Sequence, residues 1–182
     1  KGVILKGEKF QIEAFPLKHE TECYGYSFTE EGKIGEFDRE KAISLGVPIG
    51  PLFGELQKGK SVKAGQKTVK PEDVIDFSKG RKGKKISIVF DTLASKSYVK
   101  SIENSDILIH EASFLEERSD RAKETMHSTA LEAGKIAAEA NCKKLILFHL
   151  SARHKDNSKF ENEARKEFND VFVAEDLMEM EI

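Results

Sequence analysis

The sequence predicts an α/β fold with a partly parallel sheet. Three apolar runs, ISIVFDT (86–92), DILIHEA (106–112) and KLILFHL (144–150), have strand length, and helical segments at about 95–104 and 129–140 separate them. This order of strand, helix, strand, helix, strand is typical of parallel sheets covered by helices. With 182 residues and 38% hydrophobic side chains, the chain is long enough for one domain with a substantial core.

The chain begins with strands and then leaves the main body. Residues 2–30 contain GVILK, EKFQIEAFPL and CYGYSFTE, which alternate and turn like antiparallel strands. Residues from about 33 to 80 are rich in Gly, Pro and Lys around two short helical pieces at 38–45 and 51–57, and an apolar core pattern is hard to find there. We therefore interpret this region as an insertion.

Two helices after the insertion have predicted starts. Thr129 with Glu132 three residues later forms a capping box, and Ser158 with Glu161 repeats the pattern. The chain closes on LMEMEI (177–182), whose alternation predicts a strand at a sheet edge.

Composition sets only broad limits on function. The formal net charge of −2 decides nothing about partners, because a local basic patch is invisible in the total. The sequence contains no apolar stretch of the length of a membrane helix and no leader pattern, so the default expectation is a soluble cytoplasmic protein without a membrane partner.

Ionisable residues end each of the three apolar runs. Asp91 follows the first run, His110 and Glu111 end the second, and His149 ends the third. In an open α/β sheet, ligands bind at the carboxyl ends of the strands. Each residue alone is more simply a cap or a core polar group, but together they indicate a site.

A further imidazole at the end of an earlier strand, His19, suggests metal binding. The imidazoles of His19 and His149 and the carboxylate of Asp91 suit zinc, and a carboxylate can bridge two ions. These three ligands would make an incomplete two-metal site.

Other candidates surround this group. His127 lies just before the capped helix, whose N-terminus favours an anion such as phosphate, and Glu111 could hold its other ring nitrogen while His127 donates a proton. An ordinary helix flank is the competing interpretation. Ser151 and Arg153 carry donors suited to phosphate, although such a pair is also common in surface loops.

The insertion contains a glycine-proline motif, VPIGPLFGELQKGK (47–60). Its glycines and proline predict a tight backbone with exposed N–H groups, and its lysines add charge that could contact phosphates; the residues concerned are Gly50, Pro51, Gly54, Lys58 and Lys60. A second basic run, KGRKGKK, covers 79–85. The alternative for both is a solvated loop.

These motifs together resemble the ribonuclease Z family of the metallo-β-lactamase superfamily. The resemblance runs from about residue 8 to 182. It is carried, in order, by LKHETECYGYSF, PIGPLFGELQKG, FDT, HEASF, the HST loop and FHLSAR. Several ordered motifs are far more specific than any single one.

The resemblance implies a zinc-dependent endoribonuclease that removes the 3′ trailer from precursor tRNA, with two Zn²⁺ per intact active site. It implies that His19, Asp91 and His149 are metal ligands, with Asp91 bridging, and that Glu111 and His127 are a charge-relay pair at the leaving group. It also implies that Ser151 and Arg153 contact phosphate and that the arm at about 33–80 binds tRNA away from the catalytic centre, in a homodimer.

The family's HxHxDH motif, which supplies the other ligands, occurs nowhere in this chain. We therefore expect a C-terminal portion, chiefly the second half of the family's αββα sandwich with the inserted arm, that is inactive alone. Two alternatives are a different phosphodiesterase or hydrolase of the superfamily and a non-catalytic RNA-binding module.

Overall fold

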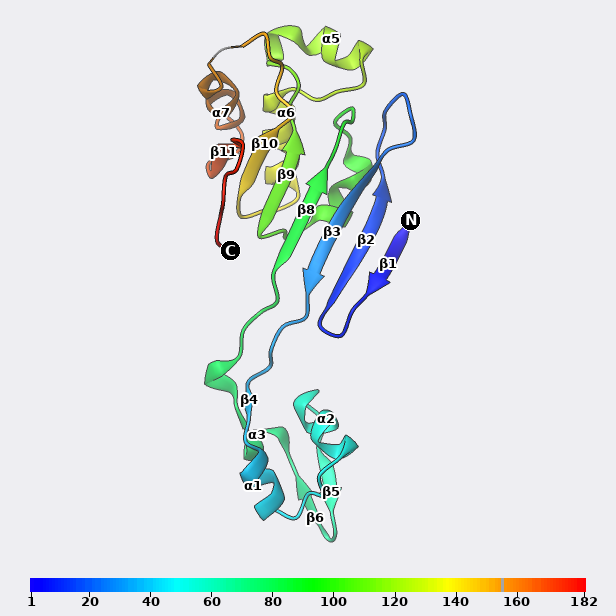
Figure 1. Cartoon of the computed structure of the whole chain (residues 1–182), viewed down its shortest axis with the longest axis vertical. Helices are drawn as coiled ribbons and strands as arrows, with labels where there is room; N and C mark the ends of the chain where they lie inside the picture. The colour runs from blue at the N-terminus through cyan, green and yellow to red at the C-terminus, as the bar shows by residue number, and fades with distance from the viewer. Residues whose placement is uncertain (155) are drawn as a thin grey trace. The chain divides into compact units, whose positions relative to one another are not determined.

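A computed structural model describes residues 1–154 and 156–182. The chain divides into two compact units, one made of Lys1–Glu30 and Lys84–Ile182 and the other of Glu31–Gly83. Each unit is described by itself below (Figure 1).

The first unit is built on one mixed seven-stranded sheet. Its strand order is β1-β2-β3-β8-β9-β10-β11, with antiparallel pairing from β1 to β8 and parallel pairing from β8 to β11 (Figure 1). The predicted α/β class is confirmed. The strands are β1 (Gly2–Lys6), β2 (Phe10–Pro16), β3 (Tyr24–Glu30), β8 (Lys85–Val89), β9 (Ile107–Glu111), β10 (Leu145–Phe148) and β11 (Val171–Val173).

Helices connect the parallel strands and carry the core against one face of the sheet. They are η2 (Lys96–Tyr98), α4 (Val99–Ile102), η3 (Glu116–Arg118), α5 (Ser119–Glu124), α6 (Ala130–Glu139) and α7 (Ser158–Ala164). Fully buried Leu108 and Leu145 of the sheet, Ala133 of α6 and Phe160 of α7 belong to one apolar cluster. This packing of helix on sheet fixes the ends of the strands where the polar residues lie.

Three expectations about these elements have clear outcomes. The capping box of Thr129 and Glu132 is present at the start of α6. The box predicted for Ser158 is wrong, because the carboxylate of Asp156 accepts the N–H of Ser158 at 3.0 Å instead. The terminal segment 177–182 is not a strand, since β11 at Val171–Val173 already occupies the sheet edge beside β10.

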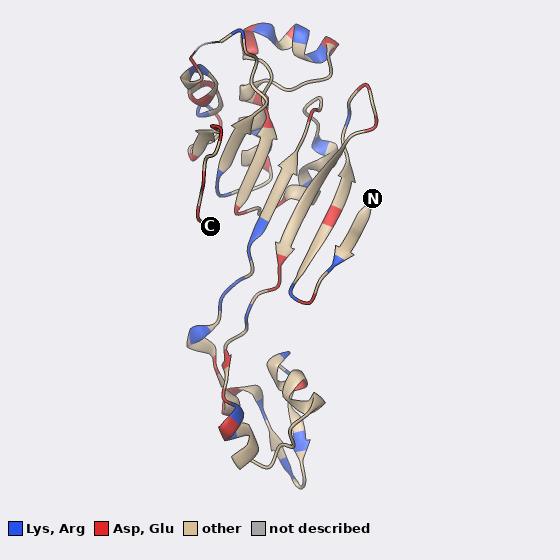
Figure 2. Cartoon of the chain, in the orientation of Figure 1, with Lys and Arg blue, Asp and Glu red and all other residues tan. Residues whose placement is uncertain are grey.

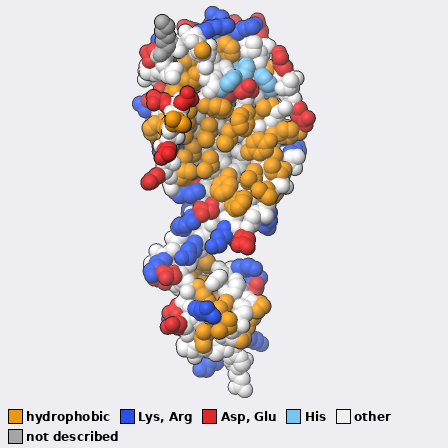
Figure 3. Space-filling model, in the orientation of Figure 1, with side chains coloured by type: hydrophobic (Ala, Val, Ile, Leu, Met, Phe, Trp, Pro, Cys, Tyr) orange, Lys and Arg blue, Asp and Glu red, His pale blue; other side chains and the backbone are white. Residues whose placement is uncertain are grey.

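The opposite face of the sheet is apolar and open. We call the open face the surface formed by Tyr26, Phe28, Ile86, Ile88, Phe90 and Phe148, which alternate with residues that point toward the helices. The ring of Phe90 lies 6.4 Å from that of Tyr26 and 5.9 Å from that of Phe148. Figure 3 shows hydrophobic side chains over this face, with histidines beyond its end. An apolar surface of this extent normally marks an interaction site.

The second unit has a small core of its own, although an apolar pattern is hard to find in its sequence. Short strands and helices surround seven buried apolar residues, among them Val47, Leu56 and Val74. The elements are β4 (Glu36–Phe37), α1 (Arg39–Ser44), α2 (Pro51–Gln57), β5 (Val62–Ala64), β6 (Lys67–Val69), α3 (Pro71–Val74), β7 (Ile75–Asp76) and η1 (Phe77–Lys79). Of the described helices, none in either unit has the length and hydrophobicity to cross a membrane.

Candidate functional site

The parallel strands bring their terminal polar residues to one edge of the sheet. Asp91 follows β8, Glu111 ends β9 and His149 follows β10. Val89 of β8 is in register with His110 of β9, and Glu111 is in register with Phe148 of β10. Because parallel strands end at the same edge, three residues far apart in sequence become neighbours.

Two overlapping groups of metal-ligating atoms form at this edge. His19, Asp91 and His127 make one group and Glu111, His127 and His149 make the other, with the atoms of each group within 4.8 Å of one another. The His149 Nδ1 lies 3.4 Å from the Asp91 Oδ1. The structure therefore brings the three expected ligands together, and His127 lies between them, with ring centroids 5.0 Å from His19 and 5.4 Å from His149.

Glu111 is a fully buried carboxylate surrounded by donors. Its Oε1 accepts the N–H of Thr92 at 3.1 Å and of Ser128 at 2.8 Å, and lies 3.1 Å from the His127 Nδ1. Its Oε2 accepts the N–H and the hydroxyl of Ser113 at 2.8 and 2.9 Å. Burial raises the pKa of Glu111, but these hydrogen bonds outweigh it and hold the pKa below its ordinary value. The carboxylate is thus ionised and fixed.

Glu111 orients His127 and makes it more basic. The hydrogen bond to Glu111 raises the pKa of His127, against the opposing effect of burial. Since the Nδ1 of His127 faces the carboxylate, Nδ1 carries a proton and Nε2 is the atom left for other chemistry. A buried acid behind a largely buried imidazole is a common arrangement for proton transfer.

Ser113 is a member of the site that the sequence interpretation did not single out. Its hydroxyl lies 3.2 Å from the His127 Nδ1 and 2.8 Å from the His149 Nδ1, and it also donates to Glu111. Its position two residues after Glu111 in HEASF was the available signal. Ser113 links the two histidines to the one carboxylate.

Of the two interpretations of the N-terminus of α6, the structure favours an ordinary helix flank over a phosphate site. The N–H of Ser128 donates to Glu111, the N–H of Thr129 donates to Glu132 at 2.9 Å, and the N–H of Leu131 donates to Glu163 at 3.3 Å. These protein carboxylates already occupy the donors that an anion would need.

Two backbone features hold histidines in place. The His19 Nδ1 lies 3.1 Å from the carbonyl oxygen of Met126, which fixes the Nδ1–H form and leaves Nε2 with its lone pair. His149 has a φ of 55° and Met126 a φ of 54°, a left-handed conformation that is uncommon outside glycine. Strain of this kind gathers at functional sites, where the surrounding structure enforces it.

His110, the remaining strand-terminal histidine, belongs to the core. It is fully buried, and its Nε2 lies 2.9 Å from the hydroxyl of Tyr98 while its Nδ1 lies 2.7 Å from the carbonyl oxygen of Glu111. Burial lowers the pKa of His110, so the ring is neutral.

Ser151 and Arg153 lie in a pocket of about 600 Å³ that adjoins the histidines. The pocket is also lined by Ser113, His127 and His149, so the structure places the two expected phosphate contacts at the same cleft.

The predicted arm residues lie together at α2 of the second unit. Gly50 has a φ of 151° and ψ of −152°, a conformation available essentially to glycine alone, and Pro51 begins the helix. Gly54 lies inside α2 rather than in a loop. Lys58 and Lys60 are exposed near Glu55, with Nζ atoms 3.7 and 2.8 Å from its carboxylate. Figure 2 colours the basic and acidic residues along the ribbon of the chain.

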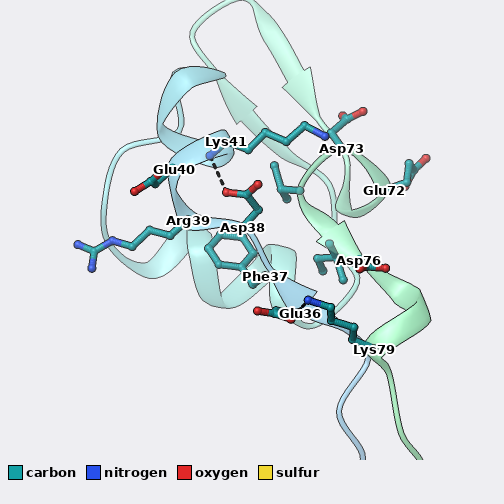
Figure 4. A pocket seen from close by; sticks show the side chains of 12 residues that line it. Glu36, Phe37, Asp38, Arg39, Glu40, Lys41, Glu72, Asp73, Asp76 and Lys79 are labelled. Atoms are coloured by element: carbon teal, nitrogen blue, oxygen red, sulfur yellow. Dashed lines mark hydrogen bonds and ion pairs between the residues drawn. The ribbon is translucent and has the colours of Figure 1, made fainter.

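The second unit also has a pocket of about 480 Å³, lined by six carboxylates and by the cations Arg39, Lys41 and Lys79 (Figure 4). Glu36, Glu40 and Glu72 lie there, and Asp38 and Asp73 accept backbone N–H groups of Lys41 and Lys70. Asp38 and Asp73 cap short helices, and the excess of carboxylates over cations disfavours phosphate at this pocket.

Comparisons with known proteins find similar proteins for the whole length of the chain. No family model matches the chain. Ribonuclease Z of Methanosarcina acetivorans is 42% identical over 182 residues, ribonuclease Z of Archaeoglobus fulgidus is 42% identical over 183 residues, and both alignments cover all of this chain. The chain spans about three fifths of these curated relatives, 59% in each case.

Solved structures show the fold. A metallo-β-lactamase-fold protein from Bacillus subtilis, YhfI, matches 93% of this chain with a TM-score of 0.58 at 20% identity, over 49% of its own length. The short form of human tRNase Z matches 97% of this chain with a TM-score of 0.55 at 23% identity, over 43% of its own length. The chain therefore has the metallo-β-lactamase fold, and over its whole length it is similar to a part of curated ribonuclease Z proteins.

Proposed function

We propose that the intact protein containing this chain is a zinc-dependent endoribonuclease that removes the 3′ trailer from precursor tRNA. One observation carries the proposal: in a chain 42% identical to ribonuclease Z, His19, Asp91 and His149 meet at one sheet edge beside a buried Glu111–His127 pair. We take this chain to be a part of that protein, since it spans 59% of the curated relatives, and we propose that the remainder covers the open face.

The donor set supports a pair of divalent ions. Two imidazoles and one carboxylate suit zinc, the Nε2 of His19 is left with its lone pair, and Asp91 has two oxygens with which to bridge. We assign His19 and Asp91 to one ion and Asp91 and His149 to the other. Bound zinc supplies Lewis acidity and lowers the pKa of water. With two ligands per ion, this chain alone would bind metal weakly.

The chain's own residues supply the proton and the phosphate contacts. Glu111 holds the Nδ1–H of His127, so that the Nε2–H of His127 donates to the departing 3′ oxygen. Ser151 and Arg153, in the adjoining pocket, donate to the phosphate oxygens.

We assign tRNA binding to the second unit, through Gly50, Pro51, Gly54, Lys58 and Lys60. The conformation of Gly50 exposes backbone before α2, and the lysines are solvent-accessible. Their pairing with Glu55 is exposed and weak, so phosphates can compete for them. The similarity to ribonuclease Z also leads us to propose a homodimer in the cytoplasm, and sedimentation of the intact protein would test its oligomeric state.

A cleavage assay tests the function. We expect the intact protein to remove the trailer from precursor tRNA and to hydrolyse bis(p-nitrophenyl) phosphate, and Asp91→Asn to abolish both activities. The Lys58→Ala/Lys60→Ala variant should lose tRNA cleavage only, with Lys63→Ala as the matched control.

Other outcomes separate the alternatives. Hydrolysis of the small diester without tRNA cleavage would indicate another phosphodiesterase, whereas tRNA binding without hydrolysis of either would indicate a binding module.

A further inference from the structure

The pocket beside the histidines extends beyond the groups that the proposed mechanism uses. Its volume is about 600 Å³, within the usual range of small-molecule sites, and Phe114, Arg121 and Thr125 line it in addition to the residues already described. The proposed mechanism gives no role to Phe114 or Arg121. The site thus has a second region with an aromatic ring and a cation.

Hydrogen bonds connect this second region to His127. The N–H of His127 donates to the carbonyl of Ala122, the residue after Arg121, at 2.9 Å. Phe114 forms an isolated β-bridge with Thr129, two residues after His127. The ring of Phe114 lies 6.2 Å from that of His127. The aromatic wall and the arginine are therefore held next to the proposed proton donor.

We propose that Phe114 and Arg121 form a subsite for the nucleotide that carries the departing 3′ oxygen. The base stacks on Phe114, the 5′-phosphate of that nucleotide pairs with Arg121, and its 3′-phosphate lies at Ser151 and Arg153. The inference rests on the proposed function, because His127 defines which oxygen departs.

The charges favour two phosphates in this pocket. Arg153 has no ion-pair partner among residues 1–154 and 156–182. Arg121 pairs with Glu124 at 2.9 Å, with both side chains more than half exposed. An exposed pair of this kind is weak, so a phosphate can displace Glu124 and engage the planar guanidinium.

Phe114 suits a base of any identity. The ring is partly exposed in the pocket rather than packed in the core. Stacking of a base on an aromatic ring tolerates every base because each has a π-face. The subsite would therefore position the nucleotide at the cleavage point without selecting its sequence.

The test measures binding of nucleotides to the full 182-residue chain by isothermal titration at low salt. Adenosine 3′,5′-bisphosphate should bind about tenfold more tightly than adenosine 3′-monophosphate, since it adds one charge-assisted contact. Arg121→Ala should abolish that difference in affinity and leave the affinity for the monophosphate within about twofold of the wild-type value. Lys123→Ala, an exposed cation on the same helix, is the matched control and should preserve the difference.

Two further variants keep the test decisive. Glu124→Gln removes the competing carboxylate and should tighten the bisphosphate only, and Phe114→Leu should weaken both nucleotides about tenfold without changing binding of ribose 5-phosphate. Equal loss of both nucleotides in Arg121→Ala, or no loss of either, would overturn the subsite. Trailer removal by the intact wild-type protein, measured separately, shows whether the proposed function itself holds.

Discussion

Substitution of Glu111 by glutamine tests the buried carboxylate on which the site depends. The two carboxylate oxygens accept from four partners: Thr92, Ser128 and His127 at Oε1, and Ser113, through both its N–H and its hydroxyl, at Oε2. A glutamine has one acceptor oxygen and one amino group. With the oxygen at the Oε1 position, the amino group faces the donors of Ser113.

The expected cost follows from these contacts. The hydroxyl of Ser113 can turn to His149, but the buried N–H of Ser113 is left without an acceptor, which costs about 1–3 kcal/mol. Replacing a charged acceptor by a neutral one weakens the bonds at Oε1 and adds about 2 kcal/mol. Glu111→Gln should therefore lower the free energy of unfolding by about 3–5 kcal/mol, a large share of a typical total of about 5–15 kcal/mol.

Urea denaturation of the metal-free chain measures this change. The control is Glu139→Gln, which removes the exposed ion pair with Lys96 and should cost less than about 0.5 kcal/mol. Because the folded pKa of Glu111 lies below 4.5, its stabilisation is present above pH 4.5 and is lost as the pH falls through the folded pKa. The difference in free energy of unfolding between wild type and Glu111→Gln should therefore become smaller below pH 4.5. A gap under about 1 kcal/mol at pH 7 would refute the reasoning.

Three other predictions concern the fold. Gly134→Ala should destabilise the protein by about 1–3 kcal/mol, because a Cβ at this position would lie 2.6 Å from the carbonyl oxygen of Ala164. Gly54→Ala, where the added Cβ would meet open space, should not destabilise it, and the urea midpoints of the two variants test this difference. Burial lowers the pKa of His110, so the stabilisation that comes from its neutral ring is present above pH 6.5 and decreases at lower pH, by up to about 1.4 kcal/mol per pH unit. His110→Gln should remove this pH dependence of the free energy of unfolding, which urea titrations between pH 5 and 8 measure. Phe90→Ser should reduce self-association of this chain on gel filtration, because Phe90 is exposed on the open face; unchanged elution at equal concentration would count against that role.

The main body of the fold was predictable because local patterns agree with its packing. The apolar runs 86–92, 106–112 and 144–150 became β8, β9 and β10, and Thr129 began its helix as its capping pattern indicated. In the small unit the helical pieces at 38–45 and 51–57 correspond to α1 and α2, but its core was not predictable, because it draws single residues from several short elements and leaves no periodic pattern. The strand predicted at 177–182 is wrong because the alternation in LMEMEI does not indicate which segment pairs with β10 at the edge of the sheet, and Val171–Val173 forms that edge strand.

The site was predictable to the extent that parallel strands align their ends. Asp91, Glu111 and His149 follow from that rule, but the distinction between Glu111, which faces the site, and His110, which faces Tyr98 in the core, depends on side-chain direction. Ser113 and the occupied N–H groups of α6 were missed, because a hydrogen-bond partner distant in sequence cannot be identified from one sequence.

Zinc binding tests most directly whether the sheet edge is a metal centre. Titration of Zn²⁺ into the 182-residue chain should give measurable, weak binding, and Asp91→Asn should weaken it by about tenfold or more, while Asp120→Asn on α5 leaves it unchanged. Equal zinc affinity in wild type and Asp91→Asn would contradict the assignment of His19, Asp91 and His149 to a shared pair of ions.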